Sequence, residues 1–316
     1  MPEKLRIGTR GSPLALWQAN HVRQLLEGAG IASELEVIRT SGDKLTNVPL
    51  AEMGGKGLFT KEIEEALLAR RIDLAVHSLK DLPTQLPSGL LLGGITRRED
   101  PRDALVSRSR QPLAELPSGV AIGTSSLRRQ VQLKRLRTDL VIKPLRGNLD
   151  TRLRKLDSGQ YDAIVVAVAG LKRLGAFERV TQVFEPEEMI PAIGQGALAI
   201  ELRADDTRMR SLLSVVHHRD TATATTAERA FLQRLGGGCQ VPIAAHARLR
   251  DDGLYLIGLV ANPEASALVR GARAGPEEEA AALGTALAEE LLARGAAEIL
   301  AAFQRQVTNV HPPGAA

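Results

Sequence analysis

Residues 5–17 have the sequence LRIGTRGSPLALW, and this stretch decides the fold class. Residues 5–9 predict a β-strand. Ser12 then has the side chain of a helix N-cap, and Pro13 suits the first helical turn because its missing N–H would have no partner there. An apolar helical face follows, formed by Leu14, Trp17, Val22 and Leu25. A strand that runs directly into a capped helix is the repeating unit of an α/β fold.

Strands and helices keep alternating up to about residue 80. The sequence predicts a strand over residues 35–40, a helix that Thr60 caps and that runs to Leu68, and a strand over residues 73–78. Residues 41–58 have no apolar periodicity and contain glycines at positions 54, 55 and 57. We predict that this segment is an inserted lid, mobile until a ligand binds.

The same pattern occurs a second time along the chain. Residues 122–126 (IGTSS) resemble residues 7–12 (IGTRGS), and residues 161–166 (YDAIVV) resemble residues 72–76 (IDLAV). In the first copy of the pattern 64 positions separate Thr9 from Asp73, whereas in the second copy only 38 separate Thr124 from Asp162. The additional residues of the first copy fall at the predicted lid. We therefore predict an α/β protein with two similar, doubly wound domains.

Three domains are predicted in all. The first comprises residues 1–96 and 197–214, the second residues 102–190, and the polar, proline-bearing connection Arg97–Asp103 is expected to be a hinge. Residues 219–316 predict a smaller α+β domain with an antiparallel sheet. Its expected elements are a helix over 221–235, strands over 243–249 and 254–260 around a turn at 251–253, and a helix over 277–294.

Composition excludes several classes of protein. The chain has 316 residues, 44% of them hydrophobic and 25% charged, which suffices to bury a core without covalent staples. Its single cysteine, Cys239, excludes an internal disulfide and a multi-cysteine metal site, and we predict no bound metal. The first residues lack the apolar core of a signal peptide, and the longest apolar run, Ala163–Leu171, is too short to span a bilayer. We expect a cytoplasmic monomer with no membrane partner.

Basic residues are concentrated between positions 128 and 155, where ten Lys and Arg face only Asp139 and Asp150. Such a run is either a solvated helical face or a site for a polyanion. No aromatic residue is interleaved, and no helix-turn-helix or zinc-finger spacing occurs. We therefore expect a small poly-carboxylate ligand and no nucleic acid.

Candidate site residues lie where predicted strands end. Ser12 and the pair Ser125-Ser126 stand at helix starts, whose N–H groups bind anions, and arginines adjoin both starts. Asp81 follows another strand and is either a general acid or base, or a capping residue paired with Lys80. Cys239 is either an inert buried cysteine or, because glycines flank it, an accessible attachment point.

Five motifs carry a resemblance to a known family. They are RIGTRGSPLA (6–15), VHSLKD (76–81), GTSSLRRQ (123–130), LRGN (145–148) and GGCQVP (237–242). In this order and spacing they resemble the porphobilinogen deaminase (hydroxymethylbilane synthase) family, from the N-terminus into the third domain. The domain pair also resembles periplasmic-binding-protein domains and the effector domains of transcription regulators. The missing signal peptide argues against the first alternative, and the missing DNA-binding motif argues against the second.

The deaminase resemblance implies an enzyme that joins four porphobilinogen units head to tail, releases ammonia and liberates hydroxymethylbilane. It implies a dipyrromethane cofactor, held by a thioether to Cys239 and extended at its free end. It implies that Asp81 assists deamination and stabilises the positive pyrrole species. The other cofactor-binding residues of the family match Lys80, Ser78, Thr124, Ser125, Ser126, Arg128, Arg129 and Arg146. Its substrate-binding residues match Arg10, Ser12, Arg152, Gln195 and, in the lid, Phe59.

Porphobilinogen has two carboxylates, so the growing chain is a polyanion, which agrees with a basic site that lacks stacking aromatics. The chain departs from the family at one position of the lid. Some members have a lysine where this sequence has Glu52, and we assign position 52 no role in carboxylate binding.

Overall fold

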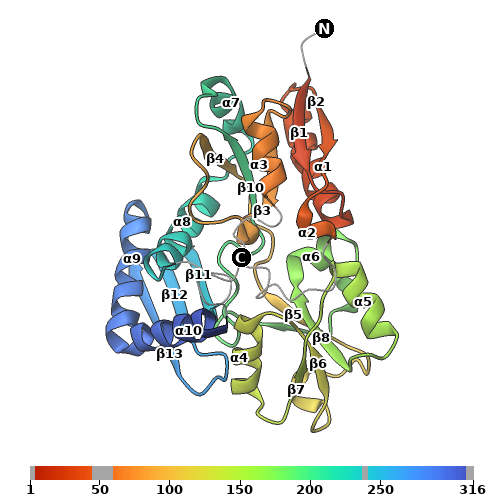
Figure 1. The fold of residues 1–316 in the computed structure, drawn as a ribbon, viewed down its shortest axis with the longest axis vertical. Coiled ribbons are helices and arrows are strands. Elements are labelled where there is room, and N and C mark those ends of the chain that lie inside the picture. The colour runs from red at the N-terminus through yellow and green to blue at the C-terminus, as the bar shows by residue number, and fades with distance from the viewer. Residues whose placement is uncertain (1–3, 45–59, 237–240, 311–316) are drawn as a thin grey trace.

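The computed structural model describes residues 4–44, 60–236 and 241–310 (Figure 1). Its strands form two five-stranded sheets and one three-stranded sheet. The predicted lid residues 45–59, which include Glu52 and Phe59, and the segment 237–240 with Cys239 lie outside the described residues.

The first sheet combines parallel and antiparallel strands. In spatial order it contains β2 (Ser33–Val37), β1 (Leu5–Thr9), β3 (Leu74–Ser78), β10 (Leu198–Arg203) and β4 (Leu90–Ile95). Strands β2, β1 and β3 are parallel, whereas β10 runs antiparallel to both of its neighbours. The helices of this part are α1 (Pro13–Gly28), α2 (Ser41–Lys44), α3 (Lys61–Leu68) and α7 (Thr207–Leu212).

Local sequence explains the first elements. Ser12 is the N-cap of α1, and its hydroxyl accepts a hydrogen bond from the N–H of Ala15, as predicted. The second strand was expected over residues 35–40, but β2 ends at Val37 because β1, its pairing partner, ends at the opposite residue Thr9. Thr60 occupies the N-cap position of α3 but makes no side-chain capping bond, so that part of the prediction was wrong.

The second sheet repeats the order of the first. It contains β7 (Val141–Lys143), β6 (Ala121–Gly123), β8 (Ala163–Ala167), β5 (Asp103–Ser107) and β9 (Gln182–Phe184). Three parallel strands are again followed by one antiparallel strand, here β5, and β9 at the edge runs antiparallel to β5. Its helices are α4 (Leu127–Leu136), α5 (Leu149–Asp157) and α6 (Val168–Arg173). The expected pair of doubly wound α/β units is therefore confirmed.

Two segments connect these sheets and touch each other where they cross. The N–H of Glu99 on the outward segment donates to the carbonyl of Gly196 on the return segment over 3.1 Å. Gly196 has φ +92°, and a Cβ at this position would lie 2.2 Å from the Glu99 carbonyl oxygen. Only glycine combines this backbone conformation with so close an approach.

The third unit packs helices on an antiparallel sheet, which confirms the α+β expectation. Its strands are β11 (Ile243–Arg250), β12 (Gly253–Ala261) and β13 (Leu268–Gly275), and its helices are α8 (Arg219–Arg234), α9 (Ala280–Leu291) and α10 (Ala297–Val310). The helix expected over 277–294 is present as the 3-10 turn Glu277–Glu279, α9 and the π-helical turn Leu292–Ala296. Gly295, at φ +108°, separates it from α10, which was not predicted.

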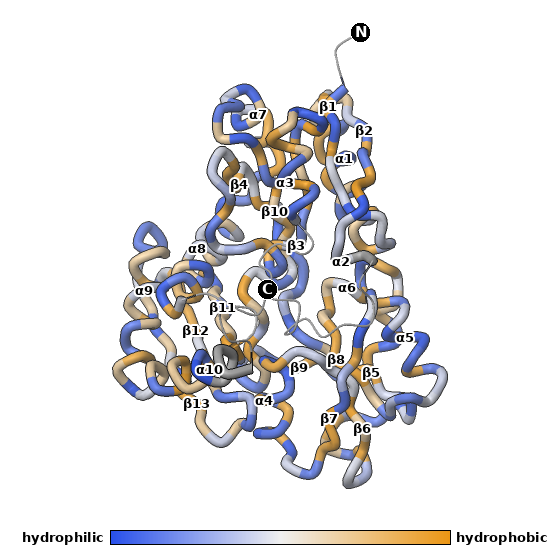
Figure 2. Tube along the Cα trace, viewed as in Figure 1, coloured by the Kyte–Doolittle hydropathy of each residue, from blue (hydrophilic) through white to orange (hydrophobic). Residues whose placement is uncertain are grey.

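Apolar residues fill the interior of each unit. Separate clusters pack on the two faces of each five-stranded sheet, and a further cluster lies between the third sheet and its helices. In Figure 2 the strands of the second sheet are mostly hydrophobic, which fits strands buried on both faces. Within the described ranges, no helix has the length and hydropathy needed to cross a membrane.

Candidate active site

The segment that carries Lys80 and Asp81 forms a single 3-10 turn, η1 (Leu79–Asp81), directly after β3. Asp81 is exposed, whereas Lys80 is half-buried, and its Nζ donates to Gln195 Oε1 over 3.3 Å. The structure gives no ion pair between these two fully described residues, so Asp81 is not held as a salt-bridge partner of Lys80. Ser78, at the end of β3, accepts a 2.8 Å hydrogen bond from Gln18 Nε2.

Gln195 links the first sheet to the second. While its Oε1 accepts from Lys80, its Nε2 donates to the carbonyl of Pro101 over 2.6 Å and to Asp103 Oδ1 over 3.0 Å. The amide is almost fully buried, which fixes its orientation. Through these hydrogen bonds the Gln195 side chain connects Lys80 to the start of β5.

The Asp103 carboxylate binds two of the predicted carboxylate-binding arginines. Arg128 Nη1 donates to Asp103 Oδ2 over 2.6 Å, and Arg129 donates to Oδ1 through Nη2 over 2.7 Å and Nε over 3.1 Å. Asp103 has no exposed surface. Burial alone would raise the pKa of its carboxyl, but the charges of both guanidiniums hold that pKa well below its usual range. Arg128 and Arg129 are thus fixed by an internal carboxylate.

The remaining cations near this pair are crowded. Burial lowers the pKa of Lys80 to about 8, with the charge of Asp81 opposing the shift and that of Arg129 adding to it. Burial also lowers the pKa of Arg152 to about 10, again with Arg129 adding to the shift and Asp81 opposing it. Burial is the largest cause of both shifts, and the charge of Arg129 is a smaller one. An anionic ligand beside Lys80 and Arg152 would stabilise their charged forms.

The predicted serines and threonine fall into two groups. Ser125 and Thr124 are engaged with backbone: Ser125 Oγ exchanges 3.0 Å hydrogen bonds with the N–H and carbonyl of Leu145, and Thr124 Oγ1 accepts from the N–H of Ser126. Ser126 is the N-cap residue of α4 but makes no side-chain capping bond. Its hydroxyl is therefore not used by its own helix, unlike that of Ser12.

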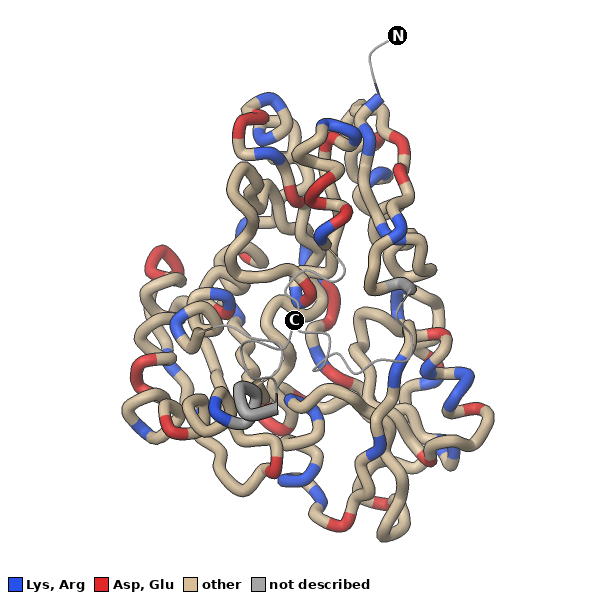
Figure 3. The backbone as a smooth tube through the Cα atoms, in the orientation of Figure 1, with Lys and Arg blue, Asp and Glu red and all other residues tan. Residues whose placement is uncertain are grey.

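The other predicted binding residues lie on neighbouring turns. Arg10 directly follows β1, and Arg146 lies between β7 and α5. Arg152 lies on α5, where its Nε donates to the carbonyl of Gly147 over 2.8 Å. Figure 3 shows the basic positions on α4 and α5, where the sequence concentrates them.

Two residues of this region were not predicted as site residues. Asp103 was assigned only to the connection, although it organises both arginines of α4. Arg173, at the end of α6, is buried, donates to the carbonyl of Gly196 over 2.6 Å and lies 5.6 Å from the centroid of Trp17. Burial lowers its pKa to about 10. The contacts of Asp103 and of Arg173 join residues far apart in sequence, so a local sequence pattern could not predict them.

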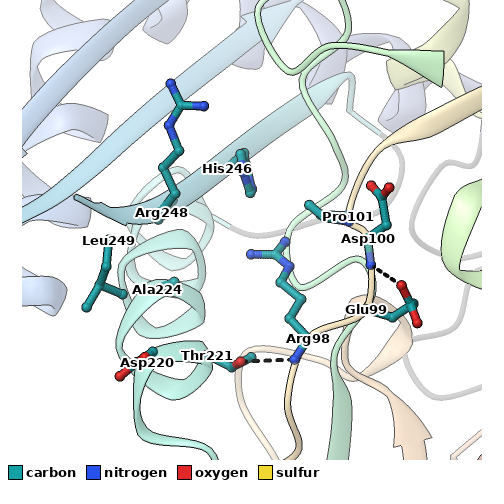
Figure 4. Close-up of a pocket in the computed structure, with 11 residues that line it drawn as sticks. Arg98, Glu99, Asp100, Pro101, Asp220, Thr221, Ala224, His246, Arg248 and Leu249 are labelled. Atoms are coloured by element: carbon teal, nitrogen blue, oxygen red, sulfur yellow. Dashed lines mark hydrogen bonds between the residues drawn. The ribbon is translucent and has the colours of Figure 1, made fainter. Parts of the chain in front are cut away.

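The connecting segment also packs against the third unit. Figure 4 shows Arg98, Glu99 and Asp100 beside Thr221 of α8, around a pocket of about 360 Å³. The N–H of Arg98 donates to Thr221 Oγ1 over 3.0 Å, and its guanidinium binds Glu228 of α8 over 2.6 and 3.2 Å. The connection between the first two units is therefore bound directly to α8 of the third unit.

Comparison with protein families agrees with this arrangement. Residues 5–211 match a family model described as porphobilinogen deaminase, dipyromethane cofactor binding domain, and residues 222–293 match one described as porphobilinogen deaminase, C-terminal domain. This chain belongs to the porphobilinogen deaminase family. Porphobilinogen deaminases are transferases that polymerise porphobilinogen to hydroxymethylbilane in tetrapyrrole biosynthesis, and they use a dipyrromethane cofactor. That is the activity, the substrate and the cofactor of this protein.

Solved structures were also compared with the deaminase chain. A putative methionine-binding lipoprotein from Bacillus subtilis is 13% identical, with 69% of this chain and 92% of that chain covered and a TM-score of 0.42. The periplasmic substrate-binding protein of an ABC transporter from Coxiella burnetii is 17% identical, with 69% and 95% covered and a TM-score of 0.42.

The residues around η1 suit the deaminase cofactor. A dipyrromethane made from two porphobilinogen units has four carboxylates, and Lys80 and Arg152 are cations whose charged forms are weakened mainly by burial and would be stabilised by such a ligand. Guanidinium forks bind carboxylates in bidentate geometry, and buried ones bind them most strongly. The chemistry of the donor set therefore fits the group.

Proposed function

We propose that Cys239 holds the dipyrromethane through a thioether and that Asp81 is the catalytic carboxylate of this deaminase. The observation that carries the proposal is that Asp81 is exposed and forms no ion pair with Lys80, yet lies near enough for its charge to act on Lys80 and Arg152. When bound, the dipyrromethane supplies the free α-carbon to which porphobilinogen units are joined. The enzyme acts on this small molecule as a cytoplasmic monomer, without nucleic acid.

The binding residues divide by what they contact. Cations and hydroxyls on β3, η1, α4 and the turn before α5 hold cofactor carboxylates, namely Lys80, Ser78, Thr124, Ser125, Ser126, Arg128, Arg129 and Arg146. The incoming porphobilinogen is held by Arg10, Ser12, Arg152, Gln195 and Phe59. This division is supported by the positions of the described residues on strand ends and helix starts, where α/β folds bind ligands.

Asp81 acts on the porphobilinogen held in this way. Breaking the C–N bond of its aminomethyl group releases ammonia and leaves an electron-poor methylene pyrrole. Its positive charge is shared with the pyrrole nitrogen, and the Asp81 carboxylate stabilises it. In its acid form Asp81 can protonate the departing amine. Because Asp81 makes no hydrogen bond or ion pair with any residue that the structure describes, its carboxylate is available for both tasks.

A single-turnover assay of ammonia release tests these roles, on protein whose two-pyrrole adduct is verified by intact mass. Asp81→Asn keeps the shape and removes the charge, so we expect release to be nearly abolished. Asp81→Glu keeps the charge at a displaced position and should retain a small, measurable rate. Cys239→Ser should fold and lack the adduct mass, since a hydroxyl is a poorer nucleophile than a thiolate. Wild-type release by Asp81→Asn, or an adduct on Cys239→Ser, would remove the respective assignment.

A further inference from the structure

The turn that carries Lys80 and Asp81 is anchored on both sides. Before these residues, the N–H of Leu79 donates to the carbonyl of Ala197 over 3.0 Å. After them, the carbonyls of Leu82 and Pro83 accept hydrogen bonds of 3.1 and 2.6 Å from one guanidinium, that of Arg229. Leu79 and Leu82 are buried in the same apolar cluster. The exposed Asp81 therefore sits on a short turn whose two ends are held.

Arg229 reaches this turn from another unit of the molecule. It lies on α8, which Figure 1 shows between the first sheet and the third sheet. Burial lowers the pKa of Arg229, and a guanidinium remains charged in proteins in any case. A charged donor bridging two successive carbonyls is a stronger anchor than a neutral hydrogen bond.

The residue beside it holds the domain connections. Glu228 has no exposed surface, binds the Arg98 guanidinium, and accepts hydrogen bonds from the N–H groups of Gly194 and Ala247 over 2.7 and 2.8 Å. Consecutive residues of α8 thus hold the connections and the Asp81 turn. The same helix ends at Arg234, five residues before Cys239 in the sequence.

We infer that Arg229 is a positioning residue for the deaminase reaction, which sets the place of Asp81 relative to the unit that bears Cys239. This inference rests on the proposed role of Asp81. Its physical basis is that α8 is one rigid element, so that the turn with Asp81 and the chain leading to Cys239 keep a fixed separation. Misplacing a reacting group by about 1 Å can cost about 100-fold in rate.

Arg229→Met tests the inference, because methionine fills similar space without a donor. We expect kcat to fall about 10- to 100-fold, in line with a displacement of up to about 1 Å, while KM for porphobilinogen changes less than twofold. Arg229→Lys can reach only one carbonyl at a time and should show an intermediate kcat. Arg234→Met is the matched control, since Arg234 lies on the same helix but is exposed and paired with Glu289; it should behave as wild type.

Hydrogen–deuterium exchange of the same purified variants supplies a readout that does not depend on turnover. In Arg229→Met, amides of residues 79–85 should exchange faster, while those of α8 and β12 keep wild-type protection. Faster exchange throughout the third unit would mean a merely structural role and overturn the inference, as would a wild-type kcat in Arg229→Met when Asp81→Asn is inactive. Wild-type turnover by Asp81→Asn would instead overturn the proposed function itself.

Discussion

Replacing Asp103 with asparagine should destabilise the second unit and disorganise both arginines of α4. The carboxylate accepts hydrogen bonds from Arg128, Arg129 and Gln195 and has no exposed surface. The amide of asparagine would turn donor hydrogens toward guanidinium donors and leave two buried cations uncompensated. Breaking a buried ion pair in this manner costs about 3–5 kcal/mol. We expect a loss of that size in the free energy of unfolding.

Urea denaturation at pH 7.5, followed by circular dichroism, measures this loss. Asp139→Asn is the matched control, because Asp139 also pairs with an arginine, Arg137, but on the surface; it should change stability very little. The folded-state pKa of Asp103 lies below its unfolded value of about 3.8. Its contribution is therefore fully present above pH 4 and is lost only as pH falls through the folded pKa. If the free energy of unfolding of Asp103→Asn differed from that of wild type by less than ~0.5 kcal/mol, the effect typical of surface substitutions, the reasoning would be refuted.

Two further predictions concern the connections and Lys80. Gly196→Ala places a Cβ 2.2 Å from the Glu99 carbonyl oxygen at φ +92° and should lower the melting temperature clearly, whereas Gly175→Ala, at φ +66° with open space around it, should lower it only slightly; equal effects would disprove the steric argument. Lys80, with a pKa of about 8, is charged below that pH and neutral above it, so its hold on the cofactor carboxylates should weaken and kcat should fall as pH increases through 8. Lys80→Arg should abolish this fall, and an unchanged pH profile would show that another group causes it.

Local patterns predicted the parts of the fold that local forces determine. Ser12 and Pro13 identified the start of α1, and the repeated strand-turn-helix pattern identified two similar units. The same reasoning did not foresee that β10 lies between β3 and β4, because strand pairing across more than a hundred residues leaves no periodic signal. The predicted helix over 277–294 stopped directly before Gly295, but α10 beyond it was missed, because a glycine after a helical stretch usually marks a helix end.

The candidate site shows the same division. The family resemblance predicted Arg128 and Arg129 to bind the carboxylates of the ligand, and this stays a prediction; the structure shows that both also pair with an internal carboxylate, that of Asp103, which was not predicted. This pairing depends on where the start of β5 lies relative to α4 in the folded protein. A local sequence pattern does not indicate that distance. Arg229 was missed for the same reason, since 146 positions separate it from Pro83.

The placement of β10 has a consequence for how the polypeptide assembles during synthesis. All five strands of the second sheet come from residues 103–184, so this sheet has its full set of strands early in translation. The first sheet must wait for residues 198–203, and until then β3 and β4 lack the strand that lies between them. Unpaired strand edges on a nascent chain invite aggregation. The second unit should therefore fold first on the ribosome, and chaperones should be needed mainly during the interval before β10 emerges.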